Sequence, residues 1–431
     1  MRRALGIVAA LVVATVAGCD EKEVGSQSCP ILCPQQNVSV KDTTLDAAFS
    51  DTTLEGFPTF GGSFQLMIAS AGDTLDSRAI IRYDSLTRAF LPVGLPADSP
   101  FVPITRPDSG RLRLVIDTAK SHVPANFTIE AYDVDTTTTD SLTSVLTPLF
   151  RADRLIGSRT FAKAELLDTI NVPLDSAKLR QIVTGGRRLR VGLKVVATGS
   201  AVIRVYSSES SFGPRLYYKA STDSGVQVVA HLPRSLTPEL FTTAQQAFTD
   251  WSQIVKGAAP LVAGSVSVGG MPARRFVLTT NLPANIVDSS EVVRATLTLT
   301  QTPNRNSYRG GDTLAIYPLV LVSTTYVLDP LRATALAVPL AGAIRSRYAR
   351  YAYSDSVRTV PTDSGPKNFE LTALLREWRL NRTYLRRVIV FRISDEGFDP
   401  GDIRFFSSTA AATLRPRIRI QYVPAASRLI P

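Results

Sequence analysis

Apolar and polar residues alternate along most of the chain after its first forty residues. Residues 111–116 and residues 294–299 show the pattern clearly, because every second side chain in them is apolar. Such alternation is typical of β-strands that bury one face. Many short stretches of this kind, separated by turn residues, predict an all-β fold of antiparallel sheets packed as sandwiches.

The alternating stretches occur twice in the same order. Residues 203–208 read Ile-Arg-Val-Tyr-Ser-Ser, and residues 403–408 read Ile-Arg-Phe-Phe-Ser-Ser. Other stretches match in the same way: 78–86 with 274–282, 111–116 with 294–299, 128–132 with 313–317, 190–195 with 387–392, and 214–218 with 416–420. We therefore expect two tandem, jelly-roll-like β-sandwich modules, at residues 39–222 and 261–425, each with a short helix near its end, at 176–183 and 373–379.

One segment has helical spacing instead. Thr237 can cap it, Pro238 suits the first helical position, and Gly257 can end it. Its apolar residues recur every three or four positions: Leu240, Phe241, Ala244, Ala247, Phe248, Trp251, Ile254 and Val255. We expect an amphipathic helix over residues 238–256, within a linker of residues 223–260, that packs on a sandwich; a partner-binding helix is the alternative.

The N-terminus has the features of an export signal. Arg2 and Arg3 precede an apolar stretch at residues 4–16, which is too short to span a bilayer. The segment ends in Val-Ala-Gly-Cys, which resembles the bacterial lipobox, whose cysteine is lipidated before cleavage. We expect residues 1–18 to be a lipoprotein signal peptide and Cys19 to carry the lipid anchor.

A polar tether follows the anchor at residues 19–38. It contains Cys29 and Cys33, for which we expect a local disulfide, because an exported protein meets an oxidising compartment. Zinc is the weaker alternative, since it would need two further ligands. We favour the outer membrane or cell surface, although Asp20 resembles an inner-membrane retention signal of enterobacteria.

The formal charge is +11, and it falls by two, to +9, once Arg2 and Arg3 leave with the signal peptide. Most of the cations are arginines spread over many strands. This distribution predicts a general attraction to acidic glycans or lipid headgroups. Nucleic acid is not expected as a partner of an exported lipoprotein.

Three features together resemble the DNRLRE-type modules of secreted bacterial proteins. Residues 78–84 have the form Arg-x-x-x-Arg-Tyr-Asp, a later strand leads into a short helix, and residues 405–408 and 415–422 have the closing forms Phe-x-Ser-Ser and Arg-Pro-Arg-Ile-x-Ile-x-Tyr. The resemblance covers most of residues 40–424 as two copies. It implies β-sandwich units, some relatives of which are carbohydrate-binding modules, including modules that bind alginate.

The residues that enzymes use are sparse. No nucleophile elbow or phosphate-binding loop occurs, and the two histidines, His122 and His231, are expected in loop or interface positions. We therefore expect no enzyme activity and no cofactor. Two carboxylate clusters could hold a structural calcium ion, with solvated loops as the simpler interpretation: Asp133 with Asp135, and Asp395 with Asp399.

Sugar binding requires exposed aromatic rings beside polar groups. Tyr348, Tyr351 and Tyr353 alternate with cations such as Arg350, which would suit an acidic polysaccharide. Trp378 is a further candidate, although burial against a sheet is the default for its position. The function expected from the sequence is a non-enzymatic envelope lipoprotein that binds a polysaccharide or an envelope protein; the alternative is a structural or assembly protein without a glycan ligand.

Overall fold

The structure, a computed structural model, describes residues 39–425 except for several gaps, at residues 47, 58–63, 93, 138–141, 221–227, 237–248, 309–310, 322–348, 352–355, 381–384, 395 and 398. Cys19, Cys29 and Cys33 therefore lie outside the described residues. All paired strands in the described part are antiparallel, which confirms the all-β, sandwich-like class. No helix in this part combines the length and the hydrophobicity that a membrane crossing needs.

Lobe 1, the described part of residues 64–257, packs two sheets face to face. The seven-stranded sheet contains β3 (Gln65–Ala71), β4 (Leu75–Tyr83), β8 (Asn126–Asp133), β9 (Leu155–Ala162), β11 (Leu189–Ala197), β12 (Ala201–Tyr206) and β15 (Asp250–Lys256). The four-stranded sheet has the order β10 (Thr169–Pro173), β7 (Asp108–Val115), β13 (Arg215–Lys219) and β14 (Val228–His231). A small hairpin, β5 (Ala89–Phe90) with β6 (Val102–Pro103), projects beyond them.

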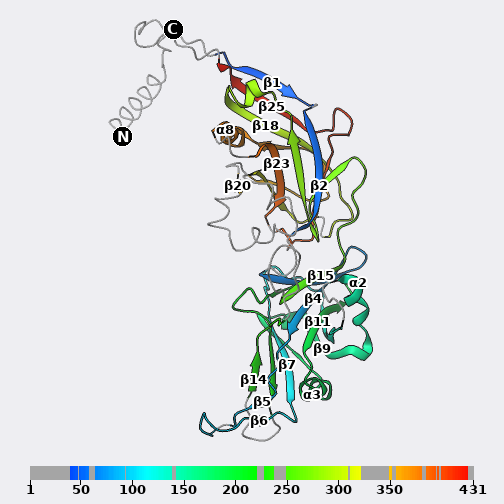
Figure 1. The fold of residues 1–431 in the computed structure, drawn as a ribbon. Helices are drawn as coiled ribbons and strands as arrows, with labels where there is room; N and C mark the ends of the chain where they lie inside the picture. The colour runs from blue at the N-terminus through cyan, green and yellow to red at the C-terminus, as the bar shows by residue number, and fades with distance from the viewer. Residues whose placement is uncertain are drawn as a thin grey trace, which may run out of the picture.

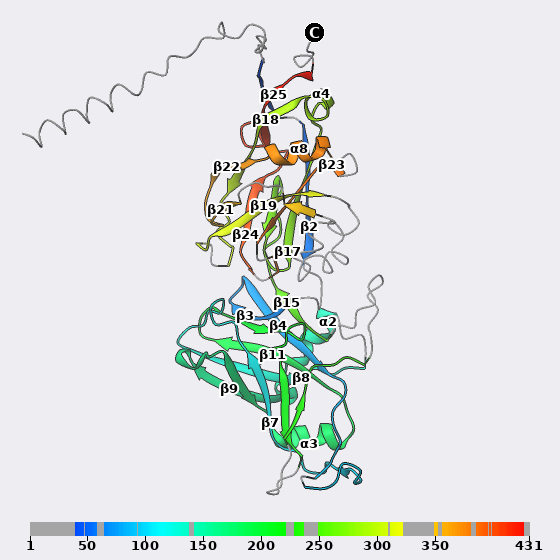
Figure 2. The ribbon, with the colours of Figure 1, turned by 90° about the vertical axis from the view of Figure 1, so that its left-hand side faces the viewer.

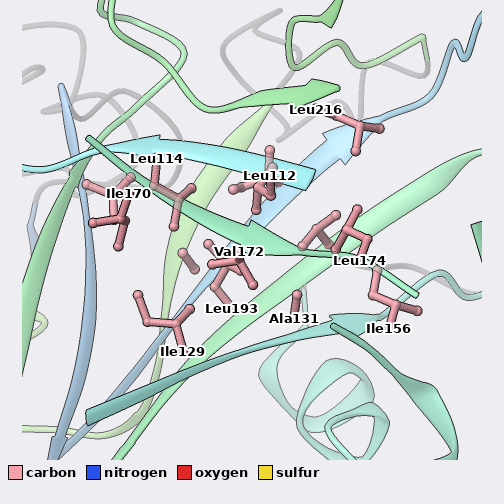
Figure 3. Close-up of a cluster of buried hydrophobic side chains, with 14 of the residues drawn as sticks. Leu112, Leu114, Ile129, Ala131, Ile156, Ile170, Val172, Leu174, Leu193 and Leu216 are labelled. Carbon is pink, nitrogen blue, oxygen red and sulfur yellow. The ribbon is translucent and has the colours of Figure 1, made fainter. Parts of the chain in front are cut away.

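The core of lobe 1 lies between these sheets (Figure 3). Leu112 and Leu114, two alternate residues of β7, both point inward and meet Ile129 of β8 and Leu193 of β11. All four are fully buried. The alternation that predicted the strands thus also supplies the core. The helix α3 (Ser176–Thr184) forms where it was predicted, and the Asp175 carboxylate accepts hydrogen bonds from the N–H groups of Ala177 (2.8 Å) and Lys178 (2.9 Å). A short helix, α2 (Thr143–Leu146), and three 3-10 turns, η1 (Thr147–Leu149), η2 (Ala152–Arg154) and η3 (Lys163–Glu165), lie between strands.

Lobe 2 is a twelve-stranded sheet that folds back on itself. Its strands are β1 (Lys41–Leu45), β2 (Phe49–Phe57), β16 (Ser265–Gly269), β17 (Ala273–Thr280), β18 (Glu291–Thr302), β19 (Leu314–Leu321), β20 (Ala349–Tyr351), β21 (Val357–Thr359), β22 (Gly365–Glu370), β23 (Leu385–Ile393), β24 (Asp402–Phe406) and β25 (Arg417–Val423). The fold-back is possible because the long strand β18 pairs with β22, β24 and β25 along its length. Phe276 stacks on Phe391 (ring centroids 4.9 Å apart), and Phe369 meets Phe391 edge-on, in a core that the two halves enclose. Two helices flank it, α4 (Ala284–Val287) and α8 (Thr372–Leu380), the latter where it was predicted.

The first strands of each repeat pair with the other repeat, if the second repeat begins at β14, within the segment expected to be a linker (residues 223–260). β1 and β2 pair with β25 and β17, whereas β14 and β15 pair with β13 and β4. Ala-Phe-Ser-Asp at residues 48–51 and Ala-Phe-Thr-Asp at residues 247–250 mark β2 and β15 as equivalents. The two repeats thus exchange their N-terminal strands, and the expected boundaries at 39–222 and 261–425 are wrong in this respect.

Equivalent hydrogen bonds in the two lobes connect each exchanged strand to the lobe with which it pairs. The Met67 N–H of β3 donates to Ser252 Oγ of β15 (2.7 Å), and the Ser267 N–H of β16 donates to Thr53 Oγ1 of β2 (3.1 Å). The N–H groups of Ser208 and Ser408, the second serine of each shared ending, donate to Asp250 and Asp51 respectively. The duplicated Ser-Ser sequence therefore anchors an exchanged strand in both lobes.

The expected helix over residues 238–256 is wrong for residues 250–256. They form β15, which lies on β4 with Trp251 opposite Ile80. Trp251 is 2% exposed and packs in a cluster with Tyr132, Val134 and Leu146. The remainder of that segment, residues 237–248, lies outside the described part of the chain.

The lobes stack end to end (Figures 1 and 2). Apolar side chains of both join at the contact: Met67, Ala69, Leu75 and Val202 from lobe 1, and Met271 and Tyr308 from lobe 2. The Ser200 hydroxyl donates to Tyr308 Oη (3.1 Å) across it. This contact joins the two lobes.

Candidate ligand-binding site

The predicted tyrosine and arginine patch lies largely outside the described residues. Tyr348 and Tyr353 are not described. Arg350 and Tyr351 belong to β20, where their backbones pair with β19 opposite Val320 and Leu319, and their side chains fall outside the described part. Ligand binding by this patch stays a prediction.

Trp378 is not available to a ligand. It lies in α8, is fully buried, and packs in the second core with Leu374 and Leu375. A sugar would need an exposed ring face, so the assignment of Trp378 as a binding residue is wrong, and the default of burial is correct.

The first proposed calcium cluster is neutralised by arginines. Asp133 forms an ion pair with Arg187 (3.0 Å), and Asp135 forms one with Arg188 (2.6 Å). These cations take the place that a metal ion would need, because carboxylates paired with guanidinium groups have few lone pairs left. The structure therefore favours arginine ion pairs over a calcium ion at Asp133 and Asp135.

The second proposed calcium cluster, Asp395 with Asp399, is only partly described. Asp395 lies outside the described residues, and Asp399 accepts a hydrogen bond from the Gly401 N–H (2.9 Å). The neighbouring Glu396 forms a buried, bidentate pair with Arg275 (2.7 and 2.6 Å). Within the described residues no group of three or more His, Cys, Asp or Glu side chains could hold a metal ion.

The histidines have structural surroundings. His231 lies on β14, stacks on Tyr218 (5.2 Å between ring centroids), and its Nε2 is 3.0 Å from the Tyr218 hydroxyl. Burial lowers the pKa of His231, which favours the neutral ring. His122 bridges to Val202 beside the contact between the lobes.

A polar hollow on lobe 2 is the best candidate site. It has a volume of about 270 Å³ and is lined by Arg294, Thr296, Thr298, Asn368, Arg419 and Gln421. These side chains come from β18, β22 and β25, whose alternate residues Leu297, Phe369 and Ile418 point into the core. The strand period therefore places every lining side chain on the outer face.

The strand register places the side chains that line the hollow in rows across the three strands. Thr298 lies opposite Asn368, and its hydroxyl donates to Asn368 Oδ1 (2.8 Å). Thr296 lies opposite Arg419, and Arg294 lies opposite Gln421. Two guanidinium groups thus flank a central strip of hydroxyl and amide groups.

Both arginines have exposed carboxylate partners. Arg419 donates to Asp42 Oδ2 through Nη2 (2.6 Å) and Nε (3.0 Å), and Arg294 lies 3.6 Å from Glu370. Hydrogen bonds from Arg419 and then Gln421 hold the pKa of Asp42 below its usual value, so Asp42 is ionised at neutral pH. Because exposed ion pairs contribute little stability, a ligand carboxylate could replace Asp42 as the partner of Arg419.

The chemistry of the hollow is that of binding. Hydroxyl, amide and guanidinium groups can hold sugar hydroxyls and carboxylates, but they include no nucleophile with an adjacent general base. Sequence reasoning did not select Arg294 or Arg419. The alternation of Ile418 and Ile420 with arginines could have placed Arg419 on an outer face, but the meeting of β18, β22 and β25 is not visible in a sequence.

No family model matches this chain, and no curated protein matches it.

Proposed function

We propose that this chain is a non-enzymatic lipoprotein of the bacterial envelope that binds a polysaccharide or another envelope component. Cys19 would carry the anchor, and tandem sandwich modules would present the binding surface. The observation that carries the proposal is the hollow on β18, β22 and β25, where Arg294 and Arg419 flank a strip of hydroxyl and amide groups. Acidic sugars fit it because guanidinium groups form strong, bidentate hydrogen bonds with carboxylates.

Glycan binding tests the role of the hollow. The chain from Asp20 to Pro431 would be screened against immobilised acidic and neutral polysaccharides. Arg294→Gln with Arg419→Gln should weaken binding of an acidic glycan by about tenfold or more, because two charge-assisted hydrogen bonds are lost. Arg151→Gln, at an exposed arginine of lobe 1, is the control. Unchanged binding by the double variant would contradict the role of the hollow.

Metabolic labelling tests the anchor. A palmitate analogue should label the full chain in a bacterial host, and Cys19→Ala should abolish the label. Label that persists in Cys19→Ala would show that the anchor is elsewhere.

A structural or assembly role is the second candidate. The exchange of β1 and β2 for β14 and β15 favours it, because two interlocked lobes suit a rigid spacer. The absence of binding to every acidic and neutral polysaccharide tested would support this role over the first.

A further inference from the structure

The four-stranded sheet of lobe 1 has an outer face that is rich in cations. Arg111 and Arg113 of β7 point away from the core, since Leu112 and Leu114 point into it. In the register of β7 with β13, Arg113 lies directly opposite Arg215, and Arg111 lies opposite Tyr217. Asn171 of β10 lies opposite Arg113 on its other side. We call Arg111, Arg113, Asn171, Arg215, Tyr217 and Lys219 the Arg111 face.

The three arginines of this face form no ion pair with a carboxylate among the described residues. Lys219, at the end of the face, lies opposite Asp108 in the register, and its positive charge is one of the causes that lower the pKa of Asp108, which also accepts a hydrogen bond from Ser176 (2.9 Å). Like charges directly opposite each other destabilise a sheet. The cross-strand pair Arg113 and Arg215 therefore has an energetic cost that an anionic ligand would remove.

An aromatic ring lies at the centre of the face. The guanidinium of Arg111 sits 4.9 Å from the ring centroid of Tyr217, and the Tyr217 phenol interacts with Arg113 and Arg215. Partial burial raises the pKa of Tyr217, but hydrogen bonds with Arg113 and Arg215 outweigh this effect, so its pKa is lowered overall. A partly exposed ring beside fixed cations and an amide is the combination that recognises a charged pyranose.

The Arg111 face and the hollow of lobe 2 occupy equivalent places in the two repeats. Arg215 and Asn171 flank Arg113 on β13 and β10, just as Arg417 and Asn368 flank Thr298 on β25 and β22. The match of 111–116 with 294–299 is therefore off by two residues. The duplication has therefore produced two outer faces on the same three-strand frame. The lobe 1 copy has the higher positive charge and is the one with a tyrosine.

We propose that the Arg111 face is a second glycan-binding site, and that its ligand is a polysaccharide with a carboxylate on successive sugars. The inference rests on the proposed function and extends it to lobe 1. Arg111, Arg113 and Arg215 bind the carboxylates, Tyr217 stacks on a sugar ring, and Asn171 bonds sugar hydroxyls. Two such faces on one chain would allow a single polymer, or two, to be held at both lobes with an avidity greater than that of either site.

Calorimetric titration of the chain from Asp20 to Pro431 with polygalacturonate tests the proposal. Methyl-esterified polygalacturonate is the matched probe, since it keeps the polymer and removes the charge. We expect binding of the acid form alone, weakening as salt is raised. Arg113→Gln with Arg215→Gln should reduce the affinity by about tenfold or more. Arg151→Gln with Lys163→Gln removes the same charge elsewhere in lobe 1 and should have less than a twofold effect.

Each outcome decides between the two sites. If only Arg294→Gln with Arg419→Gln weakens binding, the hollow of lobe 2 is the site and the inference about lobe 1 is wrong. If only the lobe 1 variant weakens binding, the inference holds and the hollow fails. Equal loss with the two control substitutions, or binding to phosphatidylglycerol vesicles in place of polygalacturonate, would overturn the proposal. Should the half-buried Arg113 and Arg215 prove necessary for folding, the exposed pair Arg111→Gln and Lys219→Gln tests the same face.

Discussion

Asp250 makes the stability of the exchanged strand β15 depend on pH. It is 1% exposed, Oδ2 accepts the Ser208 N–H (2.8 Å), and Oδ1 has no hydrogen-bond donor among the described residues. Burial, and then the negative charge of Glu209, raise the pKa of Asp250 to about 8. Burial also raises the pKa of Glu209, so at neutral pH the two neighbouring acids hold a proton as a pair. The equivalent Asp51 in lobe 2 lies beside Ser408 and Thr409, so this lobe has no second acid at that place.

Lobe 1 should lose stability as pH rises. Native Asp250 keeps its proton between its ordinary pKa of 3.8 and about 8, where unfolded Asp250 has lost it. The native state binds more protons in this interval, so the free energy of unfolding falls through it and levels off above it. Asp250→Asn, which imitates the protonated acid, should flatten this dependence and stabilise lobe 1 at pH 8 by at least about 1 kcal/mol. Urea unfolding at pH 5 and pH 8 measures both effects; an unchanged slope would contradict the assignment.

Arg275 and Glu396 form a buried ion pair whose partners could not be matched from the sequence. Both side chains are at most 4% exposed, and they meet across lobe 2 from β17 and the turn after β23. Glu396→Gln should destabilise the protein by about 3–5 kcal/mol, because it removes the carboxylate that pairs with the buried guanidinium of Arg275. Arg275→Met with Glu396→Leu should recover much of that loss. Chemical unfolding of both variants checks the prediction, and a mild effect of Glu396→Gln would show that water reaches the pair.

At the scale of elements, alternation predicted most strands, and capping residues predicted the two short helices. The sequence predicts a helix over residues 238–256 because Trp251, Ile254 and Val255 fit a helical spacing as well as a strand. Over seven residues, the length of β15, the two periods are hard to separate. The match of residues 247–250 with residues 48–51 was the signal that this segment is a duplicated strand.

Disulfide trapping tests the pairing of β2. In a chain from Gln36, which lacks the natural cysteines, Thr52→Cys with Val277→Cys should form a disulfide, since these residues lie opposite each other in β2 and β17. The strand pairing makes Ile80 the equivalent of Val277 in the first repeat, because it lies opposite Trp251; the match of 78–86 with 274–282 is therefore off by one residue. Thr52→Cys with Ile80→Cys should therefore stay reduced. Mass measurement after mild oxidation distinguishes them, and the reverse result would mean that the repeats do not exchange strands.

For the whole molecule, the exchange determines which fragments fold. Residues 64–257 contain both sheets and the core of lobe 1, whereas residues 39–222 contain one complete repeat but lack β14 and β15. If β2 replaced β15 in the shorter fragment, Thr52 would stand where Trp251 is buried, at a cost of about 3–5 kcal/mol. We expect cooperative urea unfolding for 64–257 and little stable structure for 39–222. A cooperative transition for 39–222 of equal stability would argue against the exchange.

The duplication was visible in the sequence, but the exchange and the sites were not. Matching residues 203–208 with 403–408 shows which segments are equivalent, yet says nothing of which copy each strand pairs with. The same holds for function: Arg113 and Arg215 are about a hundred positions apart in the chain, and only the register of β7 and β13 makes them neighbours. Trp378 shows the opposite case, because a residue type suited to sugar binding serves the core.

Arginine footprinting tests most directly whether both lobes bind an acidic polysaccharide. Phenylglyoxal would modify the chain with and without polygalacturonate, and mass spectrometry would report each arginine. We predict slower modification of Arg111, Arg113 and Arg215 in lobe 1 and of Arg294 and Arg419 in lobe 2, with Arg151, whose side chain is 57% exposed, unaffected. Protection that is absent from all five, or that extends equally to Arg151, would contradict the account.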